Sequence, residues 1–404
     1  MPFFDTKRPI LVLLFLSMKE SKKLLFLITQ GVVGGAQKNV FDLARSFKDS
    51  YDVSVAIGGE SDSDLFGKLE SQKIKTRHLK FLGRDINIFD DFLVFFEILK
   101  LYKKEKPDII HLHSSKVGLI GSIASFFYKL TTNNYKLKTV FTAHGWIFKE
   151  DLPRLTRSVA VFTSWLAAKF QDKIICVSED DFNKALQNKI ASPKKIFVIY
   201  NAVSPDKILT KEKARIEIGK MIGKELLNDD FVITNLGRLY ANKGLSYLID
   251  AVKEIKLKLS QVILVIFGDG PEREALERQI TSDKLQDHVF LVGDKSNASQ
   301  YLKVFDAMVL SSIKEGFPYA ILEAGMASVP VIATDVGGIG ELVKDNETGV
   351  LIESKNSKVL AESILKVYND KEFCQKISVN LKKVITKDFS FESLIEKTEW
   401  VYKT

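Results

Sequence analysis

The chain alternates between short apolar runs and longer amphipathic segments, and this alternation restricts it to a small set of folds. Runs with strand character lie in the first half at residues 24–29, 51–57, 109–113, 139–142, 173–177 and 196–200. Helical patterns such as residues 37–47 and 92–104 lie between these runs. Strands that alternate with helices predict a mostly parallel sheet covered by helices, which is an α/β fold.

The alternation starts again after the loop Asn201-Ala-Val-Ser-Pro205. The second set of predicted strands lies at residues 231–235, 261–267, 289–292, 307–310, 331–334 and 349–352, with a helical pattern at residues 245–257. A chain of 404 residues is too long for one ordinary core and fits two domains. We therefore predict two doubly wound, Rossmann-like domains over residues 22–200 and 201–389, preceded by an extension at residues 1–21.

Cysteine content and charge restrict the setting in which this chain works. Cys176 and Cys374 fall in different predicted domains, which argues against a disulfide framework and favours a reduced cytoplasm. The net charge is +8, and the excess lies in residues 1–200. It fits either an ordinary lysine-rich surface or attraction to an anionic membrane face or a pyrophosphate acceptor. No arginine stripe or binding module indicates nucleic acid, so we expect no such partner.

The apolar residues 10–17 follow Lys7 and Arg8 but precede no small-residue cleavage site. The run is shorter than the roughly 20 residues that span a bilayer as a helix. Three interpretations stay open: translation that really starts at Met18, a short membrane-docking extension, or a cleaved signal.

Two carboxylates flank a predicted helix start in the segment Glu315-Gly-Phe-Pro-Tyr-Ala-Ile-Leu-Glu323. Pro318 suits a first helical turn because its missing N–H would be unpaired there anyway. We therefore predict a helix over about residues 318–327, with Glu315 in the loop before it and Glu323 inside it. The positive end of such a helix favours an anion such as a diphosphate, and carboxylates accept hydrogen bonds from sugar hydroxyls. The segment predicts a nucleotide-sugar site.

Three further groups of residues have matching chemistry. Arg238 and Lys243 follow a predicted strand, where two cations can bind one diphosphate. Gly34 and Gly35 open a helix and lack Cβ atoms, so the backbone there can approach a phosphate or an acceptor. His144 follows an apolar strand, where a histidine is either a core residue or a substrate contact.

These motifs occur in an order that resembles the retaining glycosyltransferases of family 4, which have the GT-B fold. The motifs are Gly34-Gly-Ala-Gln37, His111-Leu-His-Ser-Ser-Lys116, Phe141-Thr-Ala-His-Gly-Trp146, Ile174-Ile-Cys-Val-Ser178, Gly237-Arg with Lys243-Gly, Glu315 to Glu323, and Ala333-Thr-Asp-Val-Gly-Gly338. The resemblance covers roughly residues 22–404. It implies that the two domains face each other across a cleft and that a final helix, residues 391–402 within the segment 390–404, crosses back to the N-terminal domain.

The resemblance also implies roles for the site residues. Glu323 would bind the ribose and Glu315 the donor sugar, and Gly316 and Phe317 would supply backbone donors. His144 would contact the sugar and help to stabilise the charged transition state. The remaining expected positions are Arg238 and Lys243 on the leaving diphosphate, in place of a metal, and Gly34, Gly35, Ser114, Ser115 and Lys116 around the acceptor.

Two patterns that could indicate a metal receive another interpretation. His111 and His113 share one face of a strand, but no cysteine lies near them and they fit the family's own His-x-His-Ser-Ser pattern. Asp62-Ser-Asp64 has a metal-binding spacing but lies in a polar loop far from the other motifs, which indicates solvated surface. We expect no metal and no cofactor besides the UDP-sugar donor.

The resemblance implies transfer of a hexose or N-acetylhexosamine from a UDP-sugar to a polyprenyl-diphosphate-linked glycan, in surface polysaccharide or glycan biosynthesis. The apolar residues 159–162 with Trp165 and Leu166 are flanked by Lys149, Arg154, Arg157 and Lys169. This pattern fits either contact with an anionic membrane at the cytoplasmic face or an ordinary buried helix with charged ends. Two alternatives stay open: a UDP-GlcNAc 2-epimerase-like enzyme of the same fold, and a nucleotide-sugar-binding protein without turnover.

Overall fold

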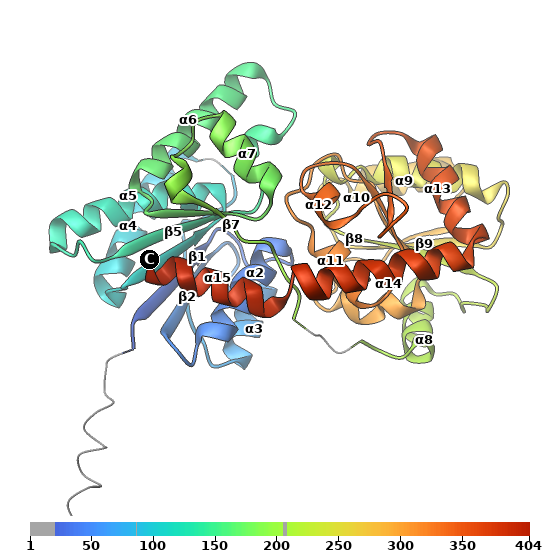
Figure 1. Cartoon of the computed structure of the whole chain (residues 1–404), viewed down its shortest axis with the longest axis horizontal. Coiled ribbons are helices and arrows are strands. Elements are labelled where there is room, and N and C mark those ends of the chain that lie inside the picture. Colours follow the sequence, from blue (N-terminus) through green and yellow to red (C-terminus); the bar gives the residue numbers. More distant parts are fainter. Residues whose placement is uncertain (1–20, 86, 205–207) are drawn as a thin grey trace, which may run out of the picture.

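The structure is a computed structural model that describes residues 21–85, 87–204 and 208–404, and in these residues it has two parallel sheets with helices on both faces (Figure 1). The first sheet contains β1 (Lys23–Ile28), β2 (Asp52–Gly58), β3 (Lys75–Leu79), β4 (Ile109–His113), β5 (Lys138–Ala143), β6 (Lys173–Cys176) and β7 (Ile196–Val198). Its helices are α2 (Gly35–Phe47), α3 (Asp64–Ser71), α4 (Ile88–Glu105), α5 (Ser115–Thr132), α6 (Arg154–Phe170) and α7 (Glu179–Gln187), with the short turns η1 (Ile147–Lys149) and η2 (Pro193–Lys195).

The second sheet contains β8 (Phe231–Leu236), β9 (Val262–Phe267), β10 (Val289–Leu291), β11 (Ala307–Leu310), β12 (Val331–Thr334) and β13 (Val350–Ile352). Its helices are α8 (Lys211–Ile222), α9 (Leu245–Lys256), α10 (Arg273–Ser282), α11 (Tyr319–Met326), α12 (Ile339–Leu342) and α13 (Ser357–Asn369), with η3 (Ala241–Lys243) and η4 (Ala298–Val304). Helices α14 (Lys371–Asp388) and α15 (Phe391–Lys403) complete the chain.

Both sheets have the doubly wound order. The first runs β3-β2-β1-β4-β5-β6-β7 and the second β10-β9-β8-β11-β12-β13. The strand order therefore reverses between β1 and β4 in one sheet and between β8 and β11 in the other. These two doubly wound sheets confirm the predicted two-domain GT-B class. Ligands bind beyond the carboxyl ends of the strands at such reversals, so each half has a place for a ligand.

Burial on both faces explains why the strands appear as continuous apolar runs. In β1 the side chains of Leu24, Phe26 and Ile28 enter one core cluster, whereas those of Leu25 and Leu27 enter the cluster on the opposite face. This is the period of two that a strand imposes. The second sheet is likewise covered by a separate cluster on each face. Tight packing of both faces holds the strand ends, and thus the site, in place.

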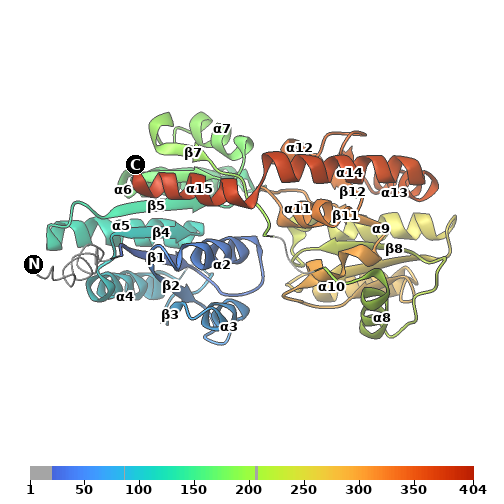
Figure 2. The ribbon, with the colours of Figure 1, turned by 60° about the horizontal axis from the view of Figure 1, so that its bottom comes forward.

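Helices α14 and α15 lie end to end along both domains (Figures 1 and 2). Leu381 and Ile385 of α14 belong to a core cluster of the second sheet, and Val401 and Tyr402 of α15 belong to one of the first sheet. The C-terminal helix therefore crosses back to the N-terminal domain as expected. None of the helices in the described ranges is both long and apolar enough to cross a membrane.

Some element boundaries differ from the predictions. Strand β3 was not predicted, because its sequence Lys-Thr-Arg-His-Leu is polar and it forms the edge of its sheet. Helix α4 begins at Ile88, four residues before the predicted start at residue 92, because the Asn87 side chain accepts hydrogen bonds from the N–H groups of Phe89 and Asp90. Pro318 is the N-cap of α11 and not its first residue.

Candidate functional site

A cavity of about 1260 Å³ lies between the two domains, at the carboxyl ends of both sheets. Its lining includes every site residue that the sequence predicted: Gly34, Gly35, Ser114, Ser115, Lys116, His144, Arg238, Lys243, Glu315, Gly316, Phe317 and Glu323. These residues follow β1, β4 and β5 in one sheet and β8 and β11 in the other. The fold thus brings together motifs that are up to about 290 residues apart.

Glu315 lies in the loop after β11 and is held by two donors. Its Oε1 accepts a hydrogen bond from Lys243 Nζ at 2.6 Å and another from Ser312 Oγ at 2.6 Å. Gly337 lies against the backbone of Glu315: its φ is +59°, and a Cβ there would come within 2.0 Å of the Glu315 carbonyl oxygen. Only glycine fits this conformation and this contact. The carboxylate is therefore fixed at the cavity wall next to a lysine.

Arg238 follows β8 and lies near a second arginine from the other domain. The guanidinium carbons of Arg84 and Arg238 lie 4.4 Å and 5.0 Å from the centre of the Tyr240 ring. Burial, together with the nearby positive charge of Arg84, lowers the pKa of Arg238. Two cations held this close have a high affinity for an anion such as a diphosphate. Sequence reasoning missed Arg84, because nothing in its local sequence indicates a contact across the cleft.

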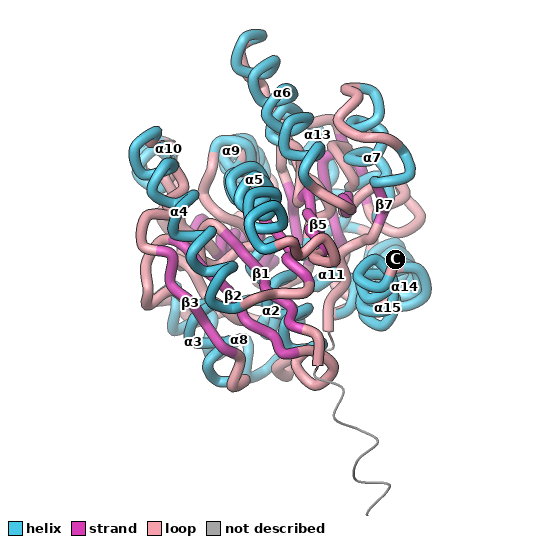
Figure 3. Tube along the Cα trace, turned by 90° about the vertical axis from the view of Figure 1, so that its left-hand side faces the viewer, coloured by secondary structure: helices cyan, strands magenta, loops and turns pink. Residues whose placement is uncertain are grey.

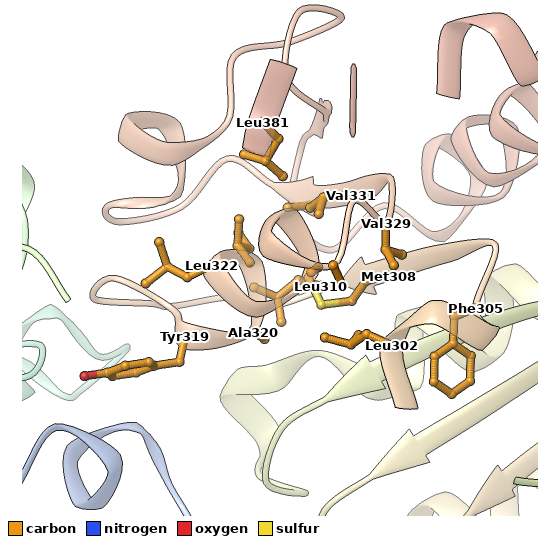
Figure 4. Packing of buried hydrophobic residues seen from close by; sticks show 14 of the residues in the cluster. Leu302, Phe305, Met308, Leu310, Tyr319, Ala320, Leu322, Val329, Val331 and Leu381 are labelled. Carbon is orange, nitrogen blue, oxygen red and sulfur yellow. The ribbon is translucent and has the colours of Figure 1, made fainter. Parts of the chain in front are cut away.

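Glu323 lies in α11 and forms an ion pair with Lys38 of α2, Nζ to Oε1 at 3.4 Å. Lys38 also lies 5.9 Å from the centre of the Tyr319 ring. The hydroxyl of Tyr319 accepts a hydrogen bond from Asn39 Nδ2 at 3.2 Å. Figure 4 shows the Tyr319 side chain pointing away from the cluster around Leu322, toward the N-terminal domain. Sequence reasoning also missed Lys38, which brings a cation to the carboxylate expected to bind ribose.

His144 is part of a histidine chain beneath the cavity. Its Nε2 lies 2.9 Å from Nδ1 of His113 in β4. His111 lies two residues before His113 in β4 and is hydrogen-bonded to the Thr142 hydroxyl at 2.7 Å and to the Tyr402 hydroxyl at 2.6 Å. Burial lowers the pKa of His111 to about 3 and that of His144 to about 4. These rings are therefore neutral at pH 7, so His144 can act on a substrate as a hydrogen-bonding dipole and not as a cation.

The N-terminal wall contains the predicted acceptor residues. Ser114 has a φ of +90° at the start of α5, and its hydroxyl is hydrogen-bonded to Thr29. Lys116 forms an ion pair with Asp91, Nζ to Oδ1 at 2.6 Å, so its positive charge is partly neutralised. A Cβ on Gly35 would lie 3.2 Å from the Tyr319 ring, so the glycine allows the two domains to approach.

Two expectations require correction. Asp64 does not lie far from the other motifs: it lines the cavity and pairs with Lys68 at 2.8 Å, because the start of α3 packs against the loop after β1. Lys149 is not a free basic residue for a membrane surface. Its Nζ pairs with Asp181 at 2.7 Å and with Asp180; burial alone would lower the pKa of Lys149, but these carboxylates outweigh burial and raise the pKa.

Comparisons with known proteins agree with the fold and the motif order. Residues 33–207 match the family model Glycosyltransferase Family 4, and residues 219–384 match the model Glycosyl transferases group 1. A UDP-Gal:alpha-D-GlcNAc-diphosphoundecaprenol alpha-1,3-galactosyltransferase of Escherichia coli is 30% identical, over 80% of this chain and 81% of its own. The capsular polysaccharide biosynthesis glycosyltransferase CapM of Staphylococcus aureus is also 30% identical, over 81% of this chain and 84% of its own.

Among solved structures, HepE of Anabaena in complex with UDP-glucose superimposes with a TM-score of 0.80, at 24% identity, covering 95% of this chain and 100% of its own. The likeness at this identity supports the fold. The chain belongs to the family 4, group 1 glycosyltransferases. It is a glycosyltransferase with two Rossmann-like domains in the GT-B arrangement.

Proposed function

We propose that this protein is a retaining glycosyltransferase that transfers a hexose or N-acetylhexosamine from a UDP-sugar to a polyprenyl-diphosphate-linked glycan. The reaction would take place at the inner face of the cytoplasmic membrane, in surface polysaccharide or glycan biosynthesis. The observation that carries the proposal is the cavity wall on which Arg238, Lys243 and the start of α11 lie beside two carboxylates, opposite His144. Such a wall complements a diphosphate joined to two hydroxyl-rich rings.

The donor fits this wall in one orientation. Arg238 and Lys243 bind the diphosphate, and the backbone N–H groups at the start of α11 add a positive dipole. Glu323 accepts hydrogen bonds from the ribose hydroxyls, which displaces Lys38 from its carboxylate. Glu315, with the backbone of Gly316 and Phe317, then contacts the sugar. These cations neutralise the leaving group, so we propose that transfer needs no divalent metal.

The transfer step follows from this orientation. The bond between the sugar C1 and the β-phosphate oxygen breaks, and the acceptor hydroxyl forms its new bond to C1 from the same face. The hydroxyl proton passes to the departing β-phosphate oxygen, so the products are UDP and a glycoside with unchanged anomeric configuration. Neutral His144 donates or accepts a hydrogen bond at the sugar. A fixed dipole at this place stabilises the transition state without reorganisation.

Relatives and surface chemistry support the acceptor and the membrane. The Escherichia coli relative acts, by its name, on a diphosphoundecaprenol-linked sugar. Helix α6 exposes Leu155 at 78% and Phe162 at 57%, and its ends carry Arg154, Arg157 and Lys169. Exposed apolar side chains beside cations favour an anionic lipid surface.

Two experiments test the proposal. A thermal-shift panel of UDP, GDP, ADP and their sugars should show stabilisation by the matching nucleotide alone. Incubation with UDP-sugars and GlcNAc-diphosphoundecaprenol in EDTA should yield a product whose new linkage, by NMR, has the donor's anomeric configuration. An inverted linkage or strict dependence on a divalent ion contradicts the mechanism. Release of a 2-epimerised sugar supports the epimerase alternative, and nucleotide binding without any hydrolysis or transfer supports the binding-protein alternative.

A further inference from the structure

The cavity extends beyond the donor site into a groove between α5 and α6, which pack side by side. We define this α5–α6 groove by Leu119 and Ile120 on α5 and by Val159, Ala160, Thr163 and Ala167 on α6. The α6 residues recur at the three- and four-residue spacing of one helix face. Figures 1 and 3 show α6 rising beyond the body of the domain, and residues of this face line the cavity.

The groove has a chemistry that differs from that of the donor site. Its α6 face carries small or short side chains, such as Ala160, Ser164 and Ala167, which leave space beside α5. The lower end is closed by Gln171, whose Nε2 donates hydrogen bonds to the Gly118 carbonyl and the Ser122 hydroxyl, both at 3.1 Å. No residue that defines the groove is charged. The donor site, by contrast, carries a cation or a carboxylate at most of its positions.

We propose that the α5–α6 groove binds the first part of the acceptor's polyprenyl chain. This inference rests on the proposed function, because it assigns a place to the lipid of that acceptor. The groove residues line the same cavity as Ser114 and Ser115, the expected acceptor positions, so a lipid attached to that acceptor can enter the groove. The groove face from Thr156 to Ala167 is roughly 16 Å long at the rise of an α-helix. This length suits a flexible apolar chain, and the hydroxyls of Thr163 and Ser164 both donate to the Ala160 carbonyl.

The opposite face of α6 explains how a lipid would reach the groove. Leu155, Phe162 and Trp165 lie on that face and are 78%, 57% and 37% exposed. The ring centres of Phe162 and Trp165 are 5.8 Å apart, and Lys169 lies 4.9 Å from the Trp165 ring. Helix α6 therefore has a lipid-compatible outer surface with a cation at its edge, and its inner surface lines the groove. A chain that leaves the bilayer beside α6 enters the groove without crossing polar surface.

A matched pair of serines on α6 provides the test. Ser164 lines the groove and Ser158 is exposed on the outer face, and each hydroxyl donates to the carbonyl four residues earlier. Ser164→Trp fills the groove, whereas Ser158→Trp adds the same side chain outside it. The substrates are GlcNAc-diphosphoundecaprenol and the same head group on a chain of two isoprene units, both in detergent micelles.

We expect the natural protein to use the long-chain acceptor with the higher kcat/KM. Ser164→Trp should lower kcat/KM for the long chain at least tenfold while the short-chain value stays within twofold. Ser158→Trp should change neither value. A Ser164→Trp variant that keeps the preference for the long chain, or that loses both activities while its melting temperature and UDP binding are unchanged, overturns the proposal.

A second measurement does not require turnover. Undecaprenyl diphosphate with a diazirine on its first isoprene units should label peptides of α5 and α6 on irradiation of the full chain. Ser164→Trp should abolish this labelling and Ser158→Trp should not. Labelling elsewhere overturns the proposal even if transfer to a lipid acceptor is observed. Labelling of α5 and α6 supports the groove even if no transfer is found, in which case the proposed function fails alone.

Other occupants give distinct outcomes in the same assay. Labelling of α6 that appears only in a chain beginning at Met18 assigns the groove to the apolar residues 10–17 and overturns the proposal. A dimer that Ser164→Trp dissociates assigns the groove to a second copy, and likewise overturns it.

Discussion

The ion pair between Lys243 and Glu315 predicts an unusual response to mutation: Glu315→Gln should tighten UDP binding and abolish transfer. The two charges lie 2.6 Å apart, and the Glu315 side chain is only 9% exposed. In the proposed donor site the diphosphate competes with Glu315 for Lys243. Glutamine keeps the shape and the hydrogen bond from Ser312 but removes the negative charge. The substitution therefore frees Lys243 and removes a repulsion between the carboxylate and the phosphates.

The size of the effect follows from the ion pair. Two unit charges at this distance attract by about 6 kcal/mol at an effective dielectric constant of about 20. Most of this is offset by desolvation, and hydrogen bonds to charged groups contribute about 1.5–3 kcal/mol net. Since every 1.4 kcal/mol changes a dissociation constant by about tenfold, we expect UDP to bind about ten- to a hundredfold more tightly. Transfer should fall by a much larger factor, because we propose that Glu315 contacts the sugar.

Isothermal titration calorimetry of UDP measures the first effect and product formation from the UDP-sugar the second. Ser312→Ala is the control, since Ser312 donates to the same Glu315 oxygen but is neutral. It should change UDP affinity by less than about threefold, because it leaves the charges of Glu315 and Lys243 unchanged. A Glu315→Gln variant that binds UDP more weakly, or with an unchanged dissociation constant, would refute the competition between Glu315 and the diphosphate.

Four other perturbations have defined outcomes. Arg238→Ala should weaken UDP by about 2 kcal/mol in titration calorimetry, whereas His144→Ala should lower kcat with little change in UDP affinity; the reverse pattern contradicts the assigned roles. Gly337→Ala should lower kcat by misplacing Glu315, because a Cβ would lie 2.0 Å from its carbonyl oxygen; wild-type kcat would exclude that constraint. His111 and His144 have folded pKa values of about 3 and 4, below the unfolded value near 6.5. Their contribution to the free energy of unfolding is complete above pH 6.5 and falls by about 3 kcal/mol per histidine as the pH is lowered toward 4. A urea midpoint that is as high at pH 5 as at pH 7 would contradict the neutral histidine chain.

The strands and most site residues were predictable because they depend on local sequence. An apolar run such as residues 262–267 is buried on both faces, so its strand is visible without knowledge of its neighbours. Site residues follow such runs directly, as His144 follows β5. Strand β3 was not predictable in this way: it pairs with β2 on one side only, and its side chains are mostly polar. Sheet pairing, and not its own composition, makes it a strand.

Contacts across the cleft were not predictable. Arg84 and Tyr240 are 156 residues apart, and Lys38 and Glu323 lie in different domains. Arg84, Tyr240 and Lys38 have the local sequence of ordinary surface positions, and the motif around Glu323 does not indicate its partner. Such pairs depend on the relative placement of two domains, which no local pattern encodes. The site could therefore be predicted as two separate walls but not as a closed set of partners.

The loop that contains Glu315 and Phe317 is also connected to the two places where the chain crosses between the domains. Tyr200 lies at the first crossing and Phe389 at the second, between α14 and α15, and their ring centres are 4.9 Å apart. Phe317 packs on both, at 4.8 Å from Tyr200 and 5.2 Å from Phe389. Phe317 is two residues after Glu315, and its carbonyl accepts a hydrogen bond from Asn201 at 2.8 Å. Because close-packed rings resist independent movement, a rotation of one domain against the other has to pivot at this cluster. The position of the Glu315 carboxylate is therefore set by the same contacts that set the angle between the domains.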